Sequence, residues 1–132
     1  RMEFLRPLTN LAFGTNLCGA KGVKYLAQSE VLVNLTSLNL FYNRIGNEGV
    51  KYLAVSDNLL SLQNLVITDN EITDEGAIVL AKFLPLFTNL VRLDLRLNRI
   101  KEEGKDALRE AQKMSNVKHL LLDKVEGFQV KN

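Results

Sequence analysis

The stretch LTSLNLFYNRIGNEGVKYLA, residues 35–54, joins a strand-like pattern to a helix-like pattern through a polar turn. In the first half, Leu38 and Leu40 alternate with polar residues, which is the period of a strand. In the second half, Val50 and Leu53 have the spacing of one helix face. Asn43 lies between the two halves, so the stretch is predicted to be one strand, turn and helix unit.

The same pattern occurs three more times without gaps. The other copies are LTNLAFGTNLCGAKGVKYLA at 8–27, LQNLVITDNEITDEGAIVLA at 62–81 and LVRLDLRLNRIKEEGKDALR at 90–109. Two columns recur at steps of 27, 27 and 28 residues: Asn16, Asn43, Asn70 and Asn98, and Gly22, Gly49, Gly76 and Gly104. A fixed period of this length indicates a repeat architecture. The one extra residue is expected within FTN, residues 87–89, where a helix connects to the next strand.

The pattern LxxLxLxxNxI, followed by a glycine and a helix, resembles the leucine-rich repeat, and most closely its ribonuclease-inhibitor-like subclass. The resemblance covers about residues 5–122. It implies an α/β fold, a right-handed solenoid bent into a horseshoe arc, with a concave parallel sheet and convex helices. One domain is predicted over 1–132, with full repeats at 8–34, 35–61, 62–89 and 90–116, a remnant of a preceding repeat at 1–7, and a partial terminal repeat and tail at 117–132.

Each unit can bury its leucines only by stacking on the next unit. On the helix side, the inward positions are expected at Leu26, Leu53, Leu80 and Leu108, and at Val23, Val50 and Ala77. Lys105 takes the position that Val23, Val50 and Ala77 occupy in the other units, so the fourth helix is expected to tilt or fray at its start. Cys18 occupies an isoleucine position and is expected to be buried and inert. The asparagine amides are expected to bond to the turn backbone and form a structural ladder of Asn16, Asn43, Asn70 and Asn98.

Composition narrows the classes of function. The 132 residues include 17 basic and 15 acidic ones, a formal charge of +2, with no block of like charge that would indicate nucleic-acid binding. No apolar run approaches the ~20 residues of a membrane span, so no membrane insertion is expected. A single cysteine excludes an intrachain disulfide and fits a reducing compartment. A cytoplasmic location is therefore predicted, with delivery into a host cytosol as the alternative for a bacterial source.

No catalytic chemistry is predicted. The sequence contains no phosphate-binding, dinucleotide-binding or zinc-protease motif. The sole histidine, His119, has no serine or cysteine nucleophile expected beside it. No catalytic residue, cofactor or metal site is therefore expected.

The strand positions that do not enter the core are expected to line the concave face. Phe41 and Tyr42 are adjacent aromatics where no core position of the repeat requires one, and Arg92, Asp94 and Arg96 alternate along one strand. The predicted partner-binding residues are Phe41, Tyr42, Val66, Asp69, Arg92, Asp94, Arg96 and His119. The competing interpretation is that the charged residues merely pair with one another and that Phe41 covers the neighbouring strand.

The predicted function is a non-enzymatic module that binds another protein through the concave sheet face. The alternative is the substrate-recognition fragment of a larger multidomain enzyme or of a secreted bacterial effector. A third interpretation is self-association through uncovered terminal repeats. The functions known in the family that the chain resembles include enzyme inhibitors, GTPase-activating proteins, innate-immune receptors, actin-filament caps and secreted bacterial effectors. Because ribonuclease inhibitors are rich in cysteine and this chain is not, that activity is disfavoured.

Overall fold

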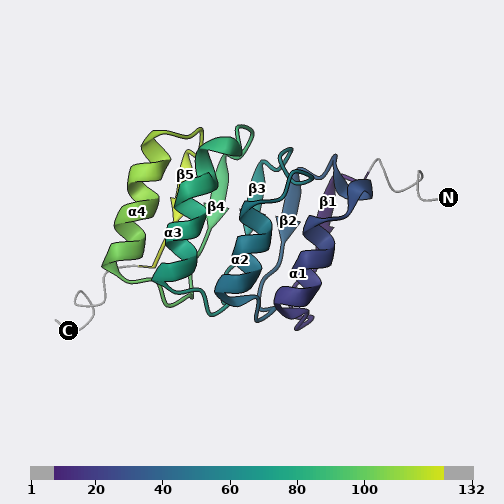
Figure 1. Ribbon diagram of the computed structural model, residues 1–132, viewed down its shortest axis with the longest axis horizontal. Helices are drawn as coiled ribbons and strands as arrows, with labels where there is room; N and C mark the ends of the chain where they lie inside the picture. Colours follow the sequence, from purple (N-terminus) through teal and green to yellow (C-terminus); the bar gives the residue numbers. More distant parts are fainter. Residues whose placement is uncertain (1–7, 124–132) are drawn as a thin grey trace.

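A computed structural model describes residues 8–123 of the chain. Strands and helices alternate throughout these residues (Figure 1). The strands are β1 (Asn10–Ala12), β2 (Ser37–Asn39), β3 (Asn64–Val66), β4 (Arg92–Asp94) and β5 (His119–Leu121). The helices are α1 (Gly19–Ala27), α2 (Gly46–Ala54), α3 (Asp74–Phe83) and α4 (Glu102–Lys113), with short 3₁₀ turns η2 (Glu30–Leu32) and η3 (Leu84–Leu86).

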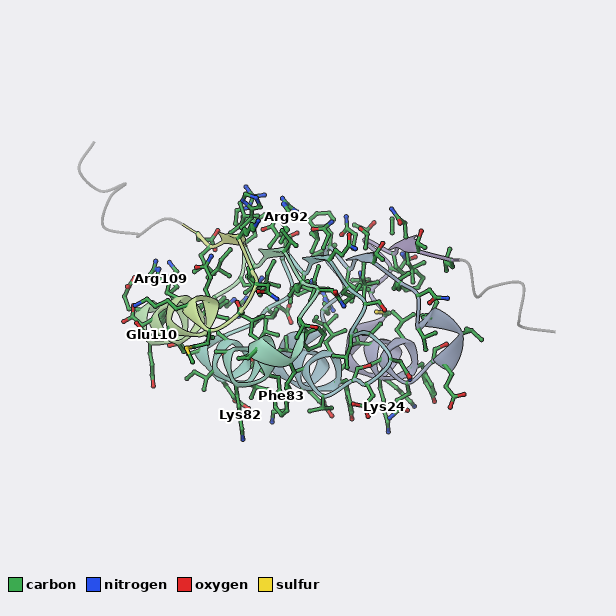
Figure 2. All side chains as sticks on the ribbon, turned by 90° about the horizontal axis from the view of Figure 1, so that it is seen from above. Lys24, Lys82, Phe83, Arg92, Arg109 and Glu110 are labelled. Atoms are coloured by element: carbon green, nitrogen blue, oxygen red, sulfur yellow. The ribbon has the colours of Figure 1, made fainter. Side chains whose placement is uncertain are left out.

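The strands form one parallel sheet in chain order, β1-β2-β3-β4-β5. In its register the central row is leucine throughout: Leu11, Leu38, Leu65, Leu93 and Leu120. All four described helices lie on the same side of this sheet, as Figure 1 and Figure 2 show from two directions. The predicted α/β leucine-rich repeat solenoid is confirmed.

The core is the layer between the sheet and the helices. In the second unit Leu35, Leu38 and Leu40 are fully buried from the strand side, and Val50 and Leu53 meet them from α2. Burial of one such side chain contributes roughly 1.5 to 3 kcal/mol relative to exposure. Because one strand and one helix cannot enclose these side chains alone, this burial depends on the units stacked on either side.

The extra residue of the third interval does not lie within residues 87–89. Leu35 and Leu62 donate their backbone N–H to the carbonyls of Leu32 and Leu59, and Leu90 donates in the same way to Phe87. Phe87 is therefore the equivalent of those buried leucines, and it is itself 3% exposed. The insertion precedes Phe87 and is absorbed by η3, which leaves Leu86 61% exposed.

Of the expected tilt or fraying at the start of α4, the fraying does not occur. Its first turn is closed, because the backbone N–H of Lys105 donates to the carbonyl of Lys101 at 3.0 Å. The Lys105 side chain turns inward instead of disturbing the helix, and the residue is only 6% exposed. Its Nζ donates to the backbone carbonyl of Asp123 at 3.0 Å, just after β5.

The first described unit is less closed than predicted. Cys18 and Leu26 are half-buried, whereas the equivalent Ile45 and Leu53 are buried. The reason is that no unit within residues 8–123 stacks on this side. A largely apolar hollow of about 420 Å³ remains there, lined among others by Leu8, Leu11, Phe13, Cys18 and Leu26. The predicted remnant at 1–7 and most of the predicted tail lie outside the described residues.

Candidate interaction face

An asparagine side chain holds the turn that follows each of the first four strands. Asn43 Oδ1 accepts the backbone N–H groups of Asn16 (3.1 Å) and Cys18 (3.2 Å). Its Nδ2 donates to the carbonyls of Phe13 (2.8 Å) and Phe41 (3.1 Å). One amide thus satisfies four backbone groups and ties its own turn to the turn of the preceding unit.

Within residues 8–123, three of the four asparagines in this column bond to the preceding unit, and Asn16 does not. Asn70 and Asn98 bond in the same way to the units before them, and Asn43 and Asn70 are fully buried. Asn16 is exposed, and its side chain donates to the carbonyl of Gly14 within its own turn. The column therefore contributes most in the middle of the array.

Left-handed backbone conformations flank this asparagine column. Within residues 8–123, the non-glycine residues with positive φ are Thr15, Leu17, Tyr42, Arg44, Asp69, Glu71 and Leu97. Such conformations are uncommon outside glycine. Because they recur from unit to unit, they belong to the turn of the repeat, and the φ of 56° at Tyr42 is not in itself a mark of function.

Phe41 and Tyr42, here called the aromatic pair, follow β2 closely. Their ring centroids are 6.2 Å apart, with the ring planes inclined by 42°. Phe41 packs against Gly14 of the preceding unit, where an added Cβ would lie 3.5 Å from the Phe41 Cβ and Cδ2. Phe41 therefore does cover the neighbouring turn. Even so, Phe41 and Tyr42 remain 38% and 40% exposed, so the aromatic pair is also an accessible apolar surface.

Arg92 and Arg96, here called the guanidinium pair, share one carboxylate. Asp94 Oδ1 accepts hydrogen bonds from Arg96 Nε (3.0 Å) and from the backbone N–H of Arg96 (3.2 Å). Asp94 Oδ2 accepts one from Arg96 Nη2 (2.8 Å). Arg92 Nη2 lies 3.4 Å from the same Oδ2. The Asp94 side chain is 4% exposed, against 38% and 49% for Arg92 and Arg96. Asp94 thus lies beneath the guanidinium pair and anchors it.

The charges of this cluster stabilise one another. Burial raises the pKa of the Asp94 carboxyl, but the hydrogen bonds from Arg96 and the charges of both arginines outweigh it, so the pKa lies below its usual value. The hydrogen bond and charge of Asp94 raise the pKa of the Arg96 guanidinium in turn. The ion pairs are therefore fully formed at neutral pH.

Polar side chains connect the guanidinium pair to β2 across the sheet. Arg92 Nη1 donates to Asn64 Oδ1 (3.3 Å), and Asn64 Nδ2 donates to Ser37 Oγ (3.2 Å). These three residues are neighbours in the sheet register. In Figure 2 the Arg92 side chain extends from the sheet away from the helices, while Lys24, Lys82 and Phe83 lie on the helix side. The guanidinium of Arg92 is therefore held in place on the concave face.

A hollow of about 400 Å³ lies beside Arg96, lined by Thr68, Asp94, Arg96, Leu97 and Asp123. Leu97 is 63% exposed, and it is not among the predicted partner-binding residues. Its backbone N–H donates to both carboxylate oxygens of Asp123, at 2.9 and 3.0 Å. Leu97 and Tyr42 occupy the same position of the repeat, directly before the asparagine. A large apolar residue at that position could have indicated from the sequence that Leu97 belongs to the same face.

The other predicted contact residues lie around these two pairs. Val66 is half-buried on β3 and is in register with Asn39 of β2 and Asp94 of β4. Asp69 is half-buried and follows β3. His119 is exposed on β5, opposite Arg92 in the register. All eight predicted residues therefore lie on the sheet side or in the turns that follow the strands, with Asp94 beneath the surface.

A second set of side chains between units was missed by the sequence reasoning. Asn47 Oδ1 accepts the backbone N–H groups of Thr73 and Gly76, both at 3.0 Å, at the start of α3. Asp74 Oδ1 accepts those of Lys101 (2.7 Å) and Gly104 (3.2 Å), at the start of α4. Asn47 and Asp74 each stand two residues before a repeat glycine, and that shared position was the missed signal. Each of these two units thus caps the helix of the next.

Residues 8–123 carry neither a metal-binding cluster nor a membrane-spanning helix. This part of the chain contains no cluster of three or more His, Cys, Asp or Glu residues that could hold a metal ion. No helix within it is long and apolar enough to cross a membrane. Burial raises the pKa of the Cys18 thiol, an effect opposed by a backbone hydrogen bond, so Cys18 is not an activated nucleophile.

The fold and face define a solenoid of leucine-rich strand and helix units. The family described as Leucine Rich repeat matches residues 31–54, 58–81 and 88–108, which is more than half of the chain. The chain belongs to the leucine-rich repeat family.

Among solved structures, the chain is similar to that of Leiomodin-1 Actin-Binding Site 2 (ABS2), with a TM-score of 0.73 and 14% identity. The match covers 98% of this chain and 80% of that one, and it shows the shared fold. The comparison with curated proteins gives no match.

Proposed function

We propose that the chain is a non-enzymatic module that binds another protein across the concave face of its sheet. The observation that carries the proposal is that the aromatic pair and the guanidinium pair remain accessible on that face, although the repeat needs neither for its core. Tyrosine and arginine are enriched among the residues that dominate binding energy at interfaces. Family membership supports the proposal, because solenoids of this kind present extended concave binding surfaces.

The proposal also extends to the subclass of the repeat and to the location of the protein. The ribonuclease-inhibitor-like subclass and a cytoplasmic location remain part of the proposal. The alternative proposal is that the chain is the substrate-recognition part of a larger enzyme or effector. It uses the same face, and it differs from the first proposal only in adding a linked catalytic domain. Self-association through the terminal repeats is a distinct proposal, and light scattering that shows a monomer at high concentration would contradict it.

The test is capture of partner proteins by the purified chain, compared with the triple variant Phe41→Ala/Tyr42→Ala/Arg96→Ala. Loss of specific partners from the variant, with its melting temperature close to that of the unchanged chain, would support the proposal. The matched control is Tyr25→Ala, because Tyr25 is 66% exposed on α1, away from the sheet face. Retention of every partner by the triple variant would contradict the concave face as the binding surface.

Purified actin filaments are a defined probe to include. The leiomodin-1 structure is that of an actin-binding site, and the two chains share a fold. Co-sedimentation of this chain with filaments, lost in the triple variant, would identify one partner. A lack of co-sedimentation would exclude actin filaments without bearing on other proteins.

A further inference from the structure

We infer that the partner is an acidic protein segment that places a carboxylate against the guanidinium pair and an apolar side chain against the aromatic pair. This inference rests on the function proposed above and adds the chemistry of the partner. Three observations support it. They are the exposure of the charges of Arg92, Asp94 and Arg96, the contacts that hold these side chains in place, and the distance between them and the aromatic pair.

The exposed charge of the cluster is positive. Two guanidinium groups share the single carboxylate of Asp94, so these three residues together carry one positive charge, while the charge of Asp123 acts on Arg96 from across the neighbouring hollow. The shared carboxylate is 4% exposed, and it already accepts hydrogen bonds on both oxygens. A partner on this strand therefore meets guanidinium groups, and their complement is an anion.

The guanidinium pair is held before any partner arrives. Arg96 is bound through two nitrogens to Asp94, and Arg92 is fixed between Asn64 and Asp94. Within residues 8–123, Arg92 Nε and Arg96 Nη1 donate no hydrogen bond to the protein. A carboxylate can accept from such donors, and the fixed side chains lose little conformational entropy on binding. The guanidinium pair is thus arranged as an anchor and is more than a pair of solvated surface charges.

The sheet sets the distance between the acidic and apolar groups of the partner. The aromatic pair follows β2, and the guanidinium pair lies along and after β4, two strands away. Neighbouring strands are about 4.8 Å apart, so the two pairs are separated by roughly 10 Å, which is about three residues of an extended segment. The partner segment is thus expected to cross the strands and carry its two groups at this spacing.

The intervening residues set the direction of the segment. Asp69 follows β3 and lies between Tyr42 and Leu97 in the same column. Its carboxylate disfavours an acidic group at the aromatic end of the face. At the other end, the hollow beside Arg96 is lined by the carboxylates of Asp94 and Asp123 as well as by Leu97, so the guanidinium of Arg92 on β4 is the more favourable place for an acidic group. The acidic group of the partner is therefore expected over β4.

The experiment selects random peptides displayed on phage against the immobilised 132-residue chain and then synthesises the enriched peptides. We expect these peptides to carry an apolar residue and an Asp or Glu about three positions apart. Their affinity should fall about tenfold or more on Arg92→Gln/Arg96→Gln, because the anchoring pairs are lost. Arg109→Gln is the matched control, since Arg109 is an exposed arginine on α4 and its loss should leave binding unchanged.

Removing both arginines leaves Asp94 buried without a cation and could unfold the chain. Changing Glu to Gln in the peptide tests the same contact on the unaltered protein, and should weaken binding to the same extent. Binding to the unaltered chain should also weaken several-fold as salt is raised, because ionic contacts are screened.

The outcomes separate the inference from the proposed function. Peptides that lose affinity for Phe41→Ala/Tyr42→Ala but tolerate both the arginine variant and the Glu to Gln change would overturn the acidic partner and leave the binding face intact. Enrichment of basic peptides would overturn it too. Peptides that tolerate every concave-face variant would contradict the proposed function itself.

Discussion

At the scale of single residues, each buried asparagine of the column forms hydrogen bonds with four backbone groups. Asn70 is fully buried, and its amide bonds to backbone groups of Leu40, Asn43, Ile45 and Thr68. A leucine of similar size would leave all four groups without a partner, and each such group costs about 1 to 3 kcal/mol when buried. Asn16 offers the natural comparison, because it is exposed and donates within its own turn.

We therefore predict that Asn70→Leu lowers the free energy of unfolding by roughly 3 to 5 kcal/mol, after partial relaxation of the turn. Asn16→Leu should lower it by less than about 1 kcal/mol. Urea denaturation of both variants measures the difference. Equal losses at the two positions would contradict a ladder that draws its strength from burial.

Asp94 is expected to make stability depend on pH. Its pKa in the folded chain lies below the ordinary value of 3.8, so its ion pairs stabilise the fold fully above that value. The contribution is lost as pH falls through the lower folded-state pKa. Asp94→Asn should therefore destabilise the chain by about 1 to 2 kcal/mol at neutral pH. The difference in free energy of unfolding between the two chains should shrink as the pH falls, which denaturation curves across the acidic range measure. A difference that stays constant with pH would show that the charge of Asp94 does not contribute.

The sequence could predict which residues share the concave face but not how deep each one lies. The alternation of Arg92, Asp94 and Arg96 places them on one face of a strand, and they do lie together. Arginine has a long side chain and aspartate a short one, so Asp94 is covered while the arginines remain exposed. That outcome depends on side-chain conformations, which the period of a strand does not determine.

At the scale of elements, the starts of α3 and α4 each depend on the preceding unit. The N–H groups at a helix start lack partners within the helix, and neither α3 nor α4 has a side-chain cap of its own. Asn47 and Asp74 supply those caps from the unit before. Helix capping thus contributes to the coupling between units as well as to the helix itself.

Asp74→Ala should accordingly destabilise the chain by about 1 kcal/mol, the usual cost of losing a helix cap. Hydrogen exchange at the Lys101 and Gly104 amides, at the start of α4, should accelerate, although the substitution is in α3. Glu75→Ala is the control, because the exposed ion pair of Glu75 with Lys51 contributes little. Exchange that accelerates in α3 alone would contradict capping across units.

The order and type of the elements followed from the period, whereas the place of the insertion did not. The repeated asparagine and glycine fix where each turn and helix begins, so strands and helices could be assigned by alignment. Leu86 and Phe87 are both apolar, and a pattern of apolar residues cannot tell which of them is buried. The geometry of η3 decides this by turning Leu86 outward.

At the scale of the whole molecule, the two ends of the described array differ. The first unit leaves an apolar hollow and the exposed Asn16. At the other end, Lys105 occupies a core column and its ammonium binds the carbonyl of Asp123. The mixed charges of α4 add to a polar outer surface there. In a solenoid, units contact only their neighbours, so the closure of an end governs how readily it opens.

We predict from this asymmetry that backbone amides in α1 exchange with solvent faster than those in α4, and that α2 and α3 exchange most slowly. Cys18 gives a second readout, because it is the single thiol and lines the hollow. Its pKa is raised above 9.0, so thiol labelling should be slow at neutral pH and should accelerate as pH rises through the pKa.

Lys105→Met tests the closure of the other end. Methionine keeps most of the apolar stem but leaves the Asp123 carbonyl without its donor, so exchange in α4 should accelerate toward the rate of α1 while Cys18 labelling stays unchanged. Lys101→Met is the matched control, because Lys101 is an exposed lysine at the start of the same helix. If α4 exchanges at the same rate with and without Lys105, the buried ammonium does not close this end, and the difference between the ends must come from the apolar hollow alone.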